Sequence, residues 1–513
     1  MVSRKMIAIF SAALLCMTFS TLSGAQTPKK GGILRIAMEG EPPSLDPHTT
    51  TAIIVMEEGI HWLEAPFTQG EKYEVIPDLA ESFKTSANLK VWNITFRKGV
   101  LFHNGKEMTS EDVVASLNRW GKRMSFGKSF YTGIESLKAT DRYSVRLTLK
   151  KGSSVVPSYL TQRARCFIYP KEVIDAAGEG TVKAYIGTGP FQLVEHRPDR
   201  YIKLKRFDKY TARQEPPNGY GGKKTVYVDE VHFIPVPEPV QRVNLLQGGE
   251  VEFSTSLVTD AYNRLKADPM LSSVISEFSW AIGVFNKKKG LFTNLKLRQA
   301  VQAALDMDPI MMNAMGSKEF YRLDPNLTYK DTVWETDAGK LYYNQANPEK
   351  AKRLMKEAGY RGETIRWLTT KHYPYHFNSA VVAVQQLQDL GFKVDLQVID
   401  WATLIKSRNN PDEWEMYTTH IGIMADPSQT AIMSCDWAGW TCYDELDALR
   451  QQLITQSKFE DRYETWKKME AFYYKNAVNI KFGDYFALRA MKKNVKGYVN
   501  MELPFFWNVW LDK

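Results

Sequence analysis

The feature that most limits the fold of this chain is that it is long and has no stretch that could span a membrane. Beyond residue 25 of the 513 residues, no uncharged apolar stretch is as long as the one at residues 7–19. Hydrophobic residues still make up 44% of the chain and aromatic residues 12%, which is enough for a large packed interior. Because one hydrophobic core rarely serves more than about 250–300 residues, we expect at least two domains.

The N-terminus has the pattern of a cleavable export signal. Arg4 and Lys5 precede the mostly apolar residues 7–19, and the small residues Ser23, Gly24 and Ala25 follow them. An apolar segment of this length covers roughly 20 Å of helix, less than the roughly 30 Å of a bilayer core, so we expect cleavage rather than a membrane anchor. Cys16 follows Leu15, where a lipoprotein signal carries a small residue. We therefore expect a periplasmic mature protein that starts near Gln26 without a lipid.

Charge and motifs argue against several functions. The chain has 67 basic and 58 acidic residues, dispersed and without an arginine-rich motif, so we expect no nucleic-acid partner. It lacks a G-x-S-x-G elbow, a phosphate loop, H-E-x-x-H and G-x-G-x-x-G, and its 8 histidines are scattered. We expect no enzymatic activity, no cofactor and no dedicated metal site, although absent motifs are weak evidence.

Three cysteines remain beyond Cys16, namely Cys166, Cys435 and Cys442. In an oxidising compartment Cys435 and Cys442 can form a disulfide and leave Cys166 buried and unpaired, but spacing alone does not prove the pairing. A zinc site is the alternative, and two cysteines without a nearby histidine supply too few ligands for it.

Caps and alternating patterns predict a mixture of helices and strands. Residues 109–112, TSED, form a capping box that opens a helix reaching Trp120. Asn347, followed by Pro348, is an N-cap for a helix that Gly359 ends. A helix over 381–390 then leads into a strand over 393–398, as in units where a helix connects neighbouring strands. Further strands are predicted over residues 31–37, 92–96, 143–149, 201–205 and 231–234.

A series of short blocks, in order, resembles one protein family along nearly all of the chain beyond residue 25. The blocks are GGIL (31–34), SLDP (44–47), IPDLA (76–80), FRKGVLFHNG (96–105), TSEDV (109–113), GTGPF (187–191), GEVE (249–252) and LRQAVQAALD (297–306). In this order they resemble the solute-binding proteins of ABC transporters, family 5, the bacterial extracellular peptide/nickel type that includes dipeptide- and oligopeptide-binding proteins. Most of these residues are expected to maintain the fold rather than to touch a ligand.

The resemblance implies a large α/β protein with α+β elements, of the two-lobed periplasmic-binding-protein-like fold (class II, cluster C type). Mixed sheets, an extra subdomain and ligand binding between lobes that close like a hinge are implied as well. On this basis we expect residues 1–25 as signal peptide, 26–60, 188–285 and 480–513 as lobe I, 61–187 as its subdomain, and 286–479 as lobe II.

Asp426 is the first candidate ligand contact. In dipeptide-binding relatives an aspartate in a strand-end loop of the second lobe pairs with the α-ammonium of the peptide, and Asp426, before Pro427, resembles it. A carboxylate buried by lobe closure is costly unless it meets a cation. Asp-Pro pairs also form turns, so a purely structural role is the alternative.

The remaining candidates are weaker. The arginine that meets the ligand carboxylate in dipeptide binders falls near Thr370, where this chain has none; Lys371 or His372 can substitute, or this is a solvated loop. Aromatic rings can form apolar walls for the ligand, with core packing as the alternative. Hydroxyl groups in a loop of the first lobe can also contact it, or form an ordinary polar loop. The aromatic candidates are Trp280, Trp401, Trp437 and Trp440, and the hydroxyl candidates are Thr49, Thr50 and Thr51.

The resemblance implies the extracytoplasmic solute-binding component of an ABC importer. We expect a monomer that captures a peptide or another small polar organic solute and delivers it to the permease subunits. The resemblance also implies that Cys435 and Cys442 pair, as a similar pair does in dipeptide-binding relatives. A nickel-type chelate bound near His420 or His372 is the alternative ligand, and a secreted enzyme is a third, less favoured reading.

Overall fold

The computed structural model describes residues 27–422 and 424–512. The expected export signal, Cys16 and the cleavage site before Gln26 lie outside these residues, so they stay predictions. Within the described ranges, no helix is both long enough and apolar enough to cross a membrane.

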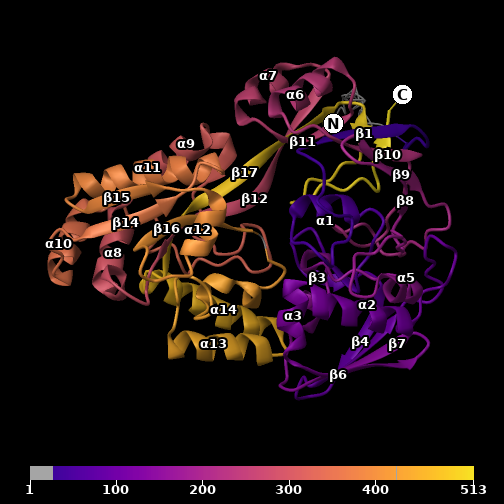
Figure 1. The fold of residues 1–513 in the computed structure, drawn as a ribbon, viewed down its shortest axis with the longest axis horizontal. Coiled ribbons are helices and arrows are strands. Elements are labelled where there is room, and N and C mark those ends of the chain that lie inside the picture. Colours follow the sequence, from indigo (N-terminus) through magenta and orange to yellow (C-terminus); the bar gives the residue numbers. More distant parts are fainter. Residues whose placement is uncertain (1–26, 423, 513) are drawn as a thin grey trace, which may run out of the picture.

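One mixed sheet runs through the molecule and joins its two halves (Figure 1). At its centre β12 (Leu271–Phe285) and β17 (Asn479–Lys492) pair antiparallel, from Leu271 opposite Lys492 to Val284 opposite Asn479. The other strands are β1 (Ile33–Met38), β8 (Phe191–Arg197), β9 (Tyr201–Arg206), β10 (Glu230–Pro235), β11 (Phe253–Leu257), β13 (Tyr321–Arg322), β14 (Thr364–Thr369), β15 (Lys393–Val398) and β16 (Met416–Gly422). Their order is β15-β14-β16-β12-β17-β11-β1-β10-β9-β8, with β13 paired to β17.

The two long strands divide this sheet into a first half, β11 to β8, and a second half, β16 to β15. Figure 1 shows β12 and β17 passing from the first half on the right to the second half on the left. The first half carries α1 (Ile53–Gly59), α6 (Pro239–Gly248) and α7 (Tyr262–Ala267). The second half carries α8 (Leu295–Ala304), α9 (Met307–Met315), α10 (Pro348–Ala358), α11 (Pro374–Asp389), α12 (Trp401–Ser407), α13 (Asp444–Thr455) and α14 (Phe459–Lys475). The lobe boundaries expected from the sequence stay predictions.

A smaller unit is built on its own antiparallel sheet within residues 80–149, in the order β4-β5-β7-β6. Its strands are β4 (Ala80–Thr85), β5 (Val91–Phe96), β6 (Ile134–Asp141), β7 (Ser144–Leu149) and the separate pair β2 (Phe67–Gln69) and β3 (Val75–Pro77). Its helices are α2 (Ser110–Arg123), α3 (Ser125–Tyr131), α4 (Val156–Tyr159) and α5 (Lys171–Ala177). A cluster of buried apolar residues that includes Trp92, Trp120 and Leu147 forms its core. Near the C-terminus β18 (Val495–Lys496) and β19 (Trp510–Leu511) form a third small pair.

The helix starts predicted from capping residues are confirmed. The Thr109 backbone N–H donates to the Asp112 carboxylate at 2.8 Å, and α2 begins at the next residue after Thr109. The Asn347 side chain accepts from the Lys350 backbone N–H at 2.9 Å, and Gly359 ends α10 with φ 74°. Such caps satisfy backbone groups that have no partner within the helix.

One helix start was wrong. The helix expected over residues 381–390 begins at Pro374, because a proline in the first turn loses no hydrogen bond there. The apolar run that indicated the later start is only its second part. The strand expected over 393–398 is confirmed as β15, and it lies parallel to β14 with α11 between them in the chain.

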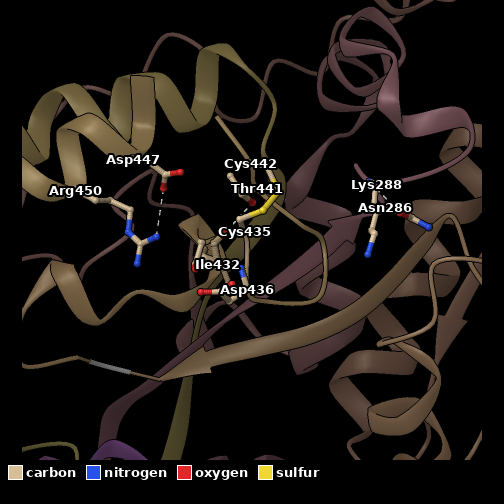
Figure 2. Close-up of a disulfide and its surroundings, with 10 residues drawn as sticks. Asn286, Lys288, Ile432, Cys435, Asp436, Thr441, Cys442, Asp447 and Arg450 are labelled. Carbon is tan, nitrogen blue, oxygen red and sulfur yellow. Dashed lines mark hydrogen bonds and ion pairs between the residues drawn. A yellow bond between two sulfur atoms is a disulfide. The ribbon is translucent and has the colours of Figure 1, made fainter. Parts of the chain in front are cut away.

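The predicted disulfide between Cys435 and Cys442 is confirmed, and Cys166 is buried with a free thiol. Figure 2 shows the disulfide beside Thr441 and Ile432. The Thr441 hydroxyl donates to the Ile432 carbonyl at 2.8 Å, so a hydrogen bond ties the ends of this loop together as well.

Candidate functional site

A cavity lies between the smaller unit and the second half, beside the crossing strand β12. It receives residues from the turn between β2 and β3, from β12, from the irregular segment 327–334 and from the end of β16 with the residues after it. Its walls are Tyr73, Trp280, Leu327, Thr328, Tyr329, Thr332, Trp334, Ile421, Gly422, Met424, Pro427 and Thr430. The cavity volume open to the centre of a water molecule is about 20 Å³, so this conformation has room for one or two waters. Binding of a solute requires the walls to move apart.

Contacts across this boundary close the cavity. The Ser154 hydroxyl donates to the Ile454 carbonyl at 3.0 Å, and the Val333 backbone N–H donates to the Lys72 carbonyl at 3.3 Å. The Ser158 hydroxyl also donates across the boundary, to the Asp426 carboxylate at 3.4 Å. Polar contacts with water can replace them when two rigid parts separate, which is the usual basis of hinge opening.

Trp280 lies on the cavity wall, and strand pairing positions it. It is 1% exposed and stands opposite Ile421 of β16 and Asp484 of β17. The Lys481 ammonium lies 5.4 Å from the Trp280 ring centre and 2.7 Å from the Asp484 carboxylate. Burial raises the pKa of Asp484, opposed by Lys481 and Arg322. A buried cation–π contact therefore fixes the ring at the centre of the sheet.

A second group of charges meets at the cavity from the smaller unit. The Arg163 Nη1 atom lies 2.9 Å from Glu502 Oε1, and the side chains are 11% and 5% exposed. The Arg163 Nη2 atom lies 2.7 Å from the position that a Cβ on Gly422 would take. Burial raises the pKa of Glu502, and the nearby arginines, led by Arg163, oppose that shift. Gly422 thus lets a guanidinium group approach the cavity wall.

Asp426 is already engaged within the protein. Its two carboxylate oxygens accept hydrogen bonds from Arg462 Nη2 at 2.8 and 2.7 Å, and the residue is 2% exposed. The carboxylate also accepts from the Ser428 backbone N–H at 3.0 Å, as the N-cap of a short turn. These bonds favour the turn-forming role of Asp426 over a role as ammonium partner, while its contact with a ligand stays untested.

The candidates around His420 gather at the carboxyl ends of β14, β15 and β16, away from the cavity walls. The Trp401 and His420 rings are stacked with centres 6.4 Å apart, and His420 Nδ1 lies 2.9 Å from His376 Nε2. Burial lowers the pKa of His420 to about 4, so this ring is neutral at pH 7. His372 and Lys371 are exposed, with the Lys371 ammonium 4.7 Å from the Phe377 ring centre.

Trp437 and Trp440, in the disulfide loop, also lie off the cavity walls. Trp440 stacks on Trp414 with ring centres 5.6 Å apart, and the Lys288 ammonium lies 5.2 Å from the Trp440 ring centre. Trp437 contacts Tyr417 at 6.1 Å between ring centres. Both rings thus support the loop that continues from the cavity segment.

The threonines of the first half make local hydrogen bonds. The Thr49 hydroxyl donates to the Asp46 carbonyl at 2.8 Å, and the Thr50 hydroxyl accepts from the Ala52 backbone N–H at 3.1 Å. The Thr51 carbonyl accepts from Arg165 Nη2 at 2.7 Å. This loop therefore reaches the arginines of the smaller unit by its backbone.

Sequence reasoning missed most of the cavity. Tyr73 and Tyr329 on the walls, and the Arg163–Glu502 pair beside them, come from four distant segments, and none carries a motif. The aromatic residues of segment 327–334, in a stretch without helix or strand, were the one available signal. For metals, residues 27–422 and 424–512 hold no group of three or more His, Cys, Asp or Glu placed to bind an ion.

Comparison with known proteins identifies the family. Residues 74–440 match the model of the bacterial extracellular solute-binding proteins, family 5, middle region. The chain belongs to this family. The chain is therefore a bacterial extracellular solute-binding protein by family.

Two curated relatives align along nearly the whole chain. A probable peptide ABC transporter periplasmic-binding protein, y4tO of Sinorhizobium fredii, is 26% identical, and the alignment covers 97% of each chain. The oligopeptide-binding protein AppA of Bacillus subtilis is also 26% identical, over 96% of this chain and 94% of the relative.

Solved structures share the fold. The substrate-binding protein CtaP of Listeria monocytogenes superposes with a TM-score of 0.81 at 21% identity, over 94% of this chain and all of that one. DppA of Helicobacter pylori, solved with the peptide STSA, gives 0.75 at 22% identity, over 94% and 99% of the chains. The fold class expected from the sequence is therefore confirmed.

Proposed function

We propose that this protein is the periplasmic solute-binding component of an ABC importer, which captures a short peptide in the cavity beside Trp280 and delivers it to the permease subunits. Full-length relatives named as peptide- and oligopeptide-binding proteins support the peptide, and one is named as part of a peptide ABC transporter. A monomer secreted through a cleaved signal is part of the proposal.

The cavity carries this proposal, because its walls come from separate units of the molecule. Tyr73 belongs to the smaller unit, whereas Trp280 lies on β12 and Met424 follows β16. In the described residues, the paired strands β12 and β17 join the two halves of the sheet, so a hinge at these strands can open and close the walls. A site of this kind releases its solute when it opens, as delivery to a permease requires.

A metal chelate is the less favoured ligand. The histidines named for it, His420 and His372, lie off the cavity walls, and His420 is hydrogen-bonded to His376. A chelate would bring its own donor atoms, so the test below includes one.

The test is native mass spectrometry of the protein purified from its own periplasm, followed by identification of whatever co-purifies. Tryptophan fluorescence then follows titration of the purified protein with pools of di- and tripeptides, and with nickel plus free histidine. A peptide that binds and is recovered unchanged supports the proposal. Binding of the nickel–histidine mixture alone, or conversion of the peptide, contradicts it.

A further inference from the structure

A buried surplus of positive charge lies beside the cavity. Arg163 and Arg165, around the turn Gln162–Ala164 of the smaller unit, and Arg489 of β17 all approach Glu502. Arg165 is 4% exposed and Arg489 is 2% exposed. In the described part of the chain, Glu502 is the only carboxylate within ion-pair distance of any of these three arginines.

Neutral oxygens satisfy most of these guanidinium groups without neutralising them. Arg489 donates to the Met501 carbonyl at 2.6 Å and to the Tyr498 hydroxyl at 3.2 Å. Arg165 donates to the carbonyls of Arg163 and Thr51, each at 2.7 Å, and its Nε has no hydrogen-bond partner. Arg163 Nη1 forms an ion pair with Glu502 Oε1 at 2.9 Å, but its N–H bonds are poorly aligned with that oxygen. Donor capacity is thus left over at Arg163 and Arg165.

Glu57, a carboxyl group that also acts on Arg489, does not balance this charge. Burial, followed by repulsion from Glu39, raises the pKa of Glu57 to about 8, so the Glu57 carboxyl is mostly protonated at pH 7. Burial lowers the pKa of Arg165 only to about 9, so that side chain stays charged. Three cations then face one carboxylate in a desolvated region, which is costly unless another anion enters.

The backbone brings the charge to the cavity. Arg165 adopts φ 59°, in the left-handed region that residues with a side chain rarely adopt. A Cβ at the wall position 422 would lie 2.7 Å from Arg163 Nη2, so a side chain there would require the guanidinium to shift. The cavity therefore has aromatic walls at Tyr73 and Trp280, and the Arg163 guanidinium lies beside its wall residue Gly422 without lining the cavity itself in this conformation.

We propose that Arg163, supported by Arg165, binds an anionic group of the solute, which for a peptide is its terminal carboxylate, and that Glu502 competes with the solute for Arg163. This inference rests on the proposed solute-binding function and specifies its ligand: an acid that carries an aromatic or apolar group for the walls at Tyr73 and Trp280. The guanidinium fork of arginine matches a carboxylate in two parallel hydrogen bonds.

The first test changes the solute and leaves the protein intact. Wild-type protein is titrated, by fluorescence and calorimetry, with tripeptides that carry a central aromatic residue, with their C-terminal amides, with their N-acetyl forms, and with phenylacetate as a non-peptide acid. Amidation is expected to weaken binding roughly 30-fold or more, and acetylation much less. Equal binding of acids and amides overturns the anion site.

The second test separates a ligand site from a latch between units. Arg163→Gln should weaken binding of the free acids roughly 30-fold or more, whereas Glu502→Gln should tighten it, because a competitor is lost. Arg142→Gln, which breaks an exposed pair with Glu107 on the same unit, is the control and should bind as wild type. If Arg163→Gln and Glu502→Gln weaken binding alike, the pair is a structural latch and the inference is wrong.

The outcomes separate the two proposals. Peptides that bind equally as acids and amides overturn the anion site and leave peptide binding standing. If phenylacetate or another non-peptide acid binds and no peptide does, the proposal that the solute is a peptide is wrong and the anion site is supported. Absence of binding by every probe overturns both. If Arg163→Gln does not fold, the comparison of acids with amides on the wild-type protein decides.

Discussion

Two buried arginine–carboxylate pairs flank the cavity, and they differ in how fully they are satisfied. Arg462 holds Asp426 with two hydrogen bonds, and the same carboxylate caps a turn. Arg163 forms a poorly aligned ion pair with Glu502, next to two more arginines. The first pair is complete within the protein and stabilises a turn. The second has unused donors and surplus charge, which is what a site for an external anion requires.

Asp426→Asn has the largest expected effect and tests the first pair directly. Asparagine can still cap the turn, but it leaves the Arg462 charge buried without its partner, which costs about 3 kcal/mol of unfolding free energy. Urea unfolding of the ligand-free protein measures this loss. An unchanged stability with a large loss of affinity would instead show that Asp426 binds the ligand ammonium.

Two further variants sharpen this comparison. Asp447→Asn breaks a partly exposed pair with Arg450 at 3.6 Å (Figure 2) and should cost less than about 1 kcal/mol. Glu502→Gln should also destabilise the free protein, but a bound acid should restore its stability through linkage. No ligand should restore the stability of Asp426→Asn in this way. If a bound acid restores the stability of both Glu502→Gln and Asp426→Asn, or of neither, the two pairs do not differ in this way.

Replacement of both Cys435 and Cys442 by serine has the next largest expected effect. The short disulfide loop should contribute about 2 kcal/mol, mainly by restricting the unfolded chain. We expect that loss in urea unfolding, together with faster hydrogen exchange in residues 427–442, which include the cavity residues Pro427 and Thr430. Residues 162–165, which carry the arginines, should exchange as before. Equal acceleration in both regions would mean that the two sides of the cavity unfold together.

Glu57→Gln tests the charge balance around the arginines. Because the folded carboxyl has a pKa of about 8 and the unfolded one about 4.5, wild-type stability falls as pH rises through that interval, by at most about 1.4 kcal/mol per unit. Glutamine does not titrate, so the variant should be increasingly more stable than wild type as the pH rises from 4.5 to 8, and no more stable near pH 4.5. Urea unfolding at pH 4.5, 6.5 and 8 measures this gain. A loss of stability in Glu57→Gln at pH 6.5 and 8 would instead show that Glu57 is ionised and pairs with the arginines.

Local chemistry made part of this fold predictable. Asn347 and Gly359 delimit α10 because a cap acts on backbone groups a few residues away. The spacing of Cys435 and Cys442 allowed the disulfide, and the family resemblance implied it. The family blocks then indicated the two-part architecture, which strands β12 and β17 produce.

The cavity could not be predicted, because its chemistry depends on distant partners. Asp426 carried two interpretations in the sequence, and the decisive partner, Arg462, lies 36 residues further on, on another helix. Arg163 and Glu502 lie in different units and meet only after the whole sheet has formed. Trp280 was named as a candidate and lies on the wall, whereas Trp401, Trp437 and Trp440 lie elsewhere. Aromatic character alone does not distinguish these positions.

Lys371→Ala has the smallest expected effect and tests the anion site by exclusion. Lys371 was the sequence candidate for the ligand carboxylate, but it is exposed, lies off the cavity walls and interacts with the Phe377 ring. Removal of an exposed cation–π contact costs about 0.5–1 kcal/mol of stability at most. Affinity for tripeptide acids should change less than about 2-fold, against a large loss in Arg163→Gln, as measured by calorimetry at equal ionic strength. If Lys371→Ala loses as much affinity for tripeptide acids as Arg163→Gln, the residue that binds the ligand carboxylate lies in the second half of the sheet. The unused donors of Arg163 would then need another explanation.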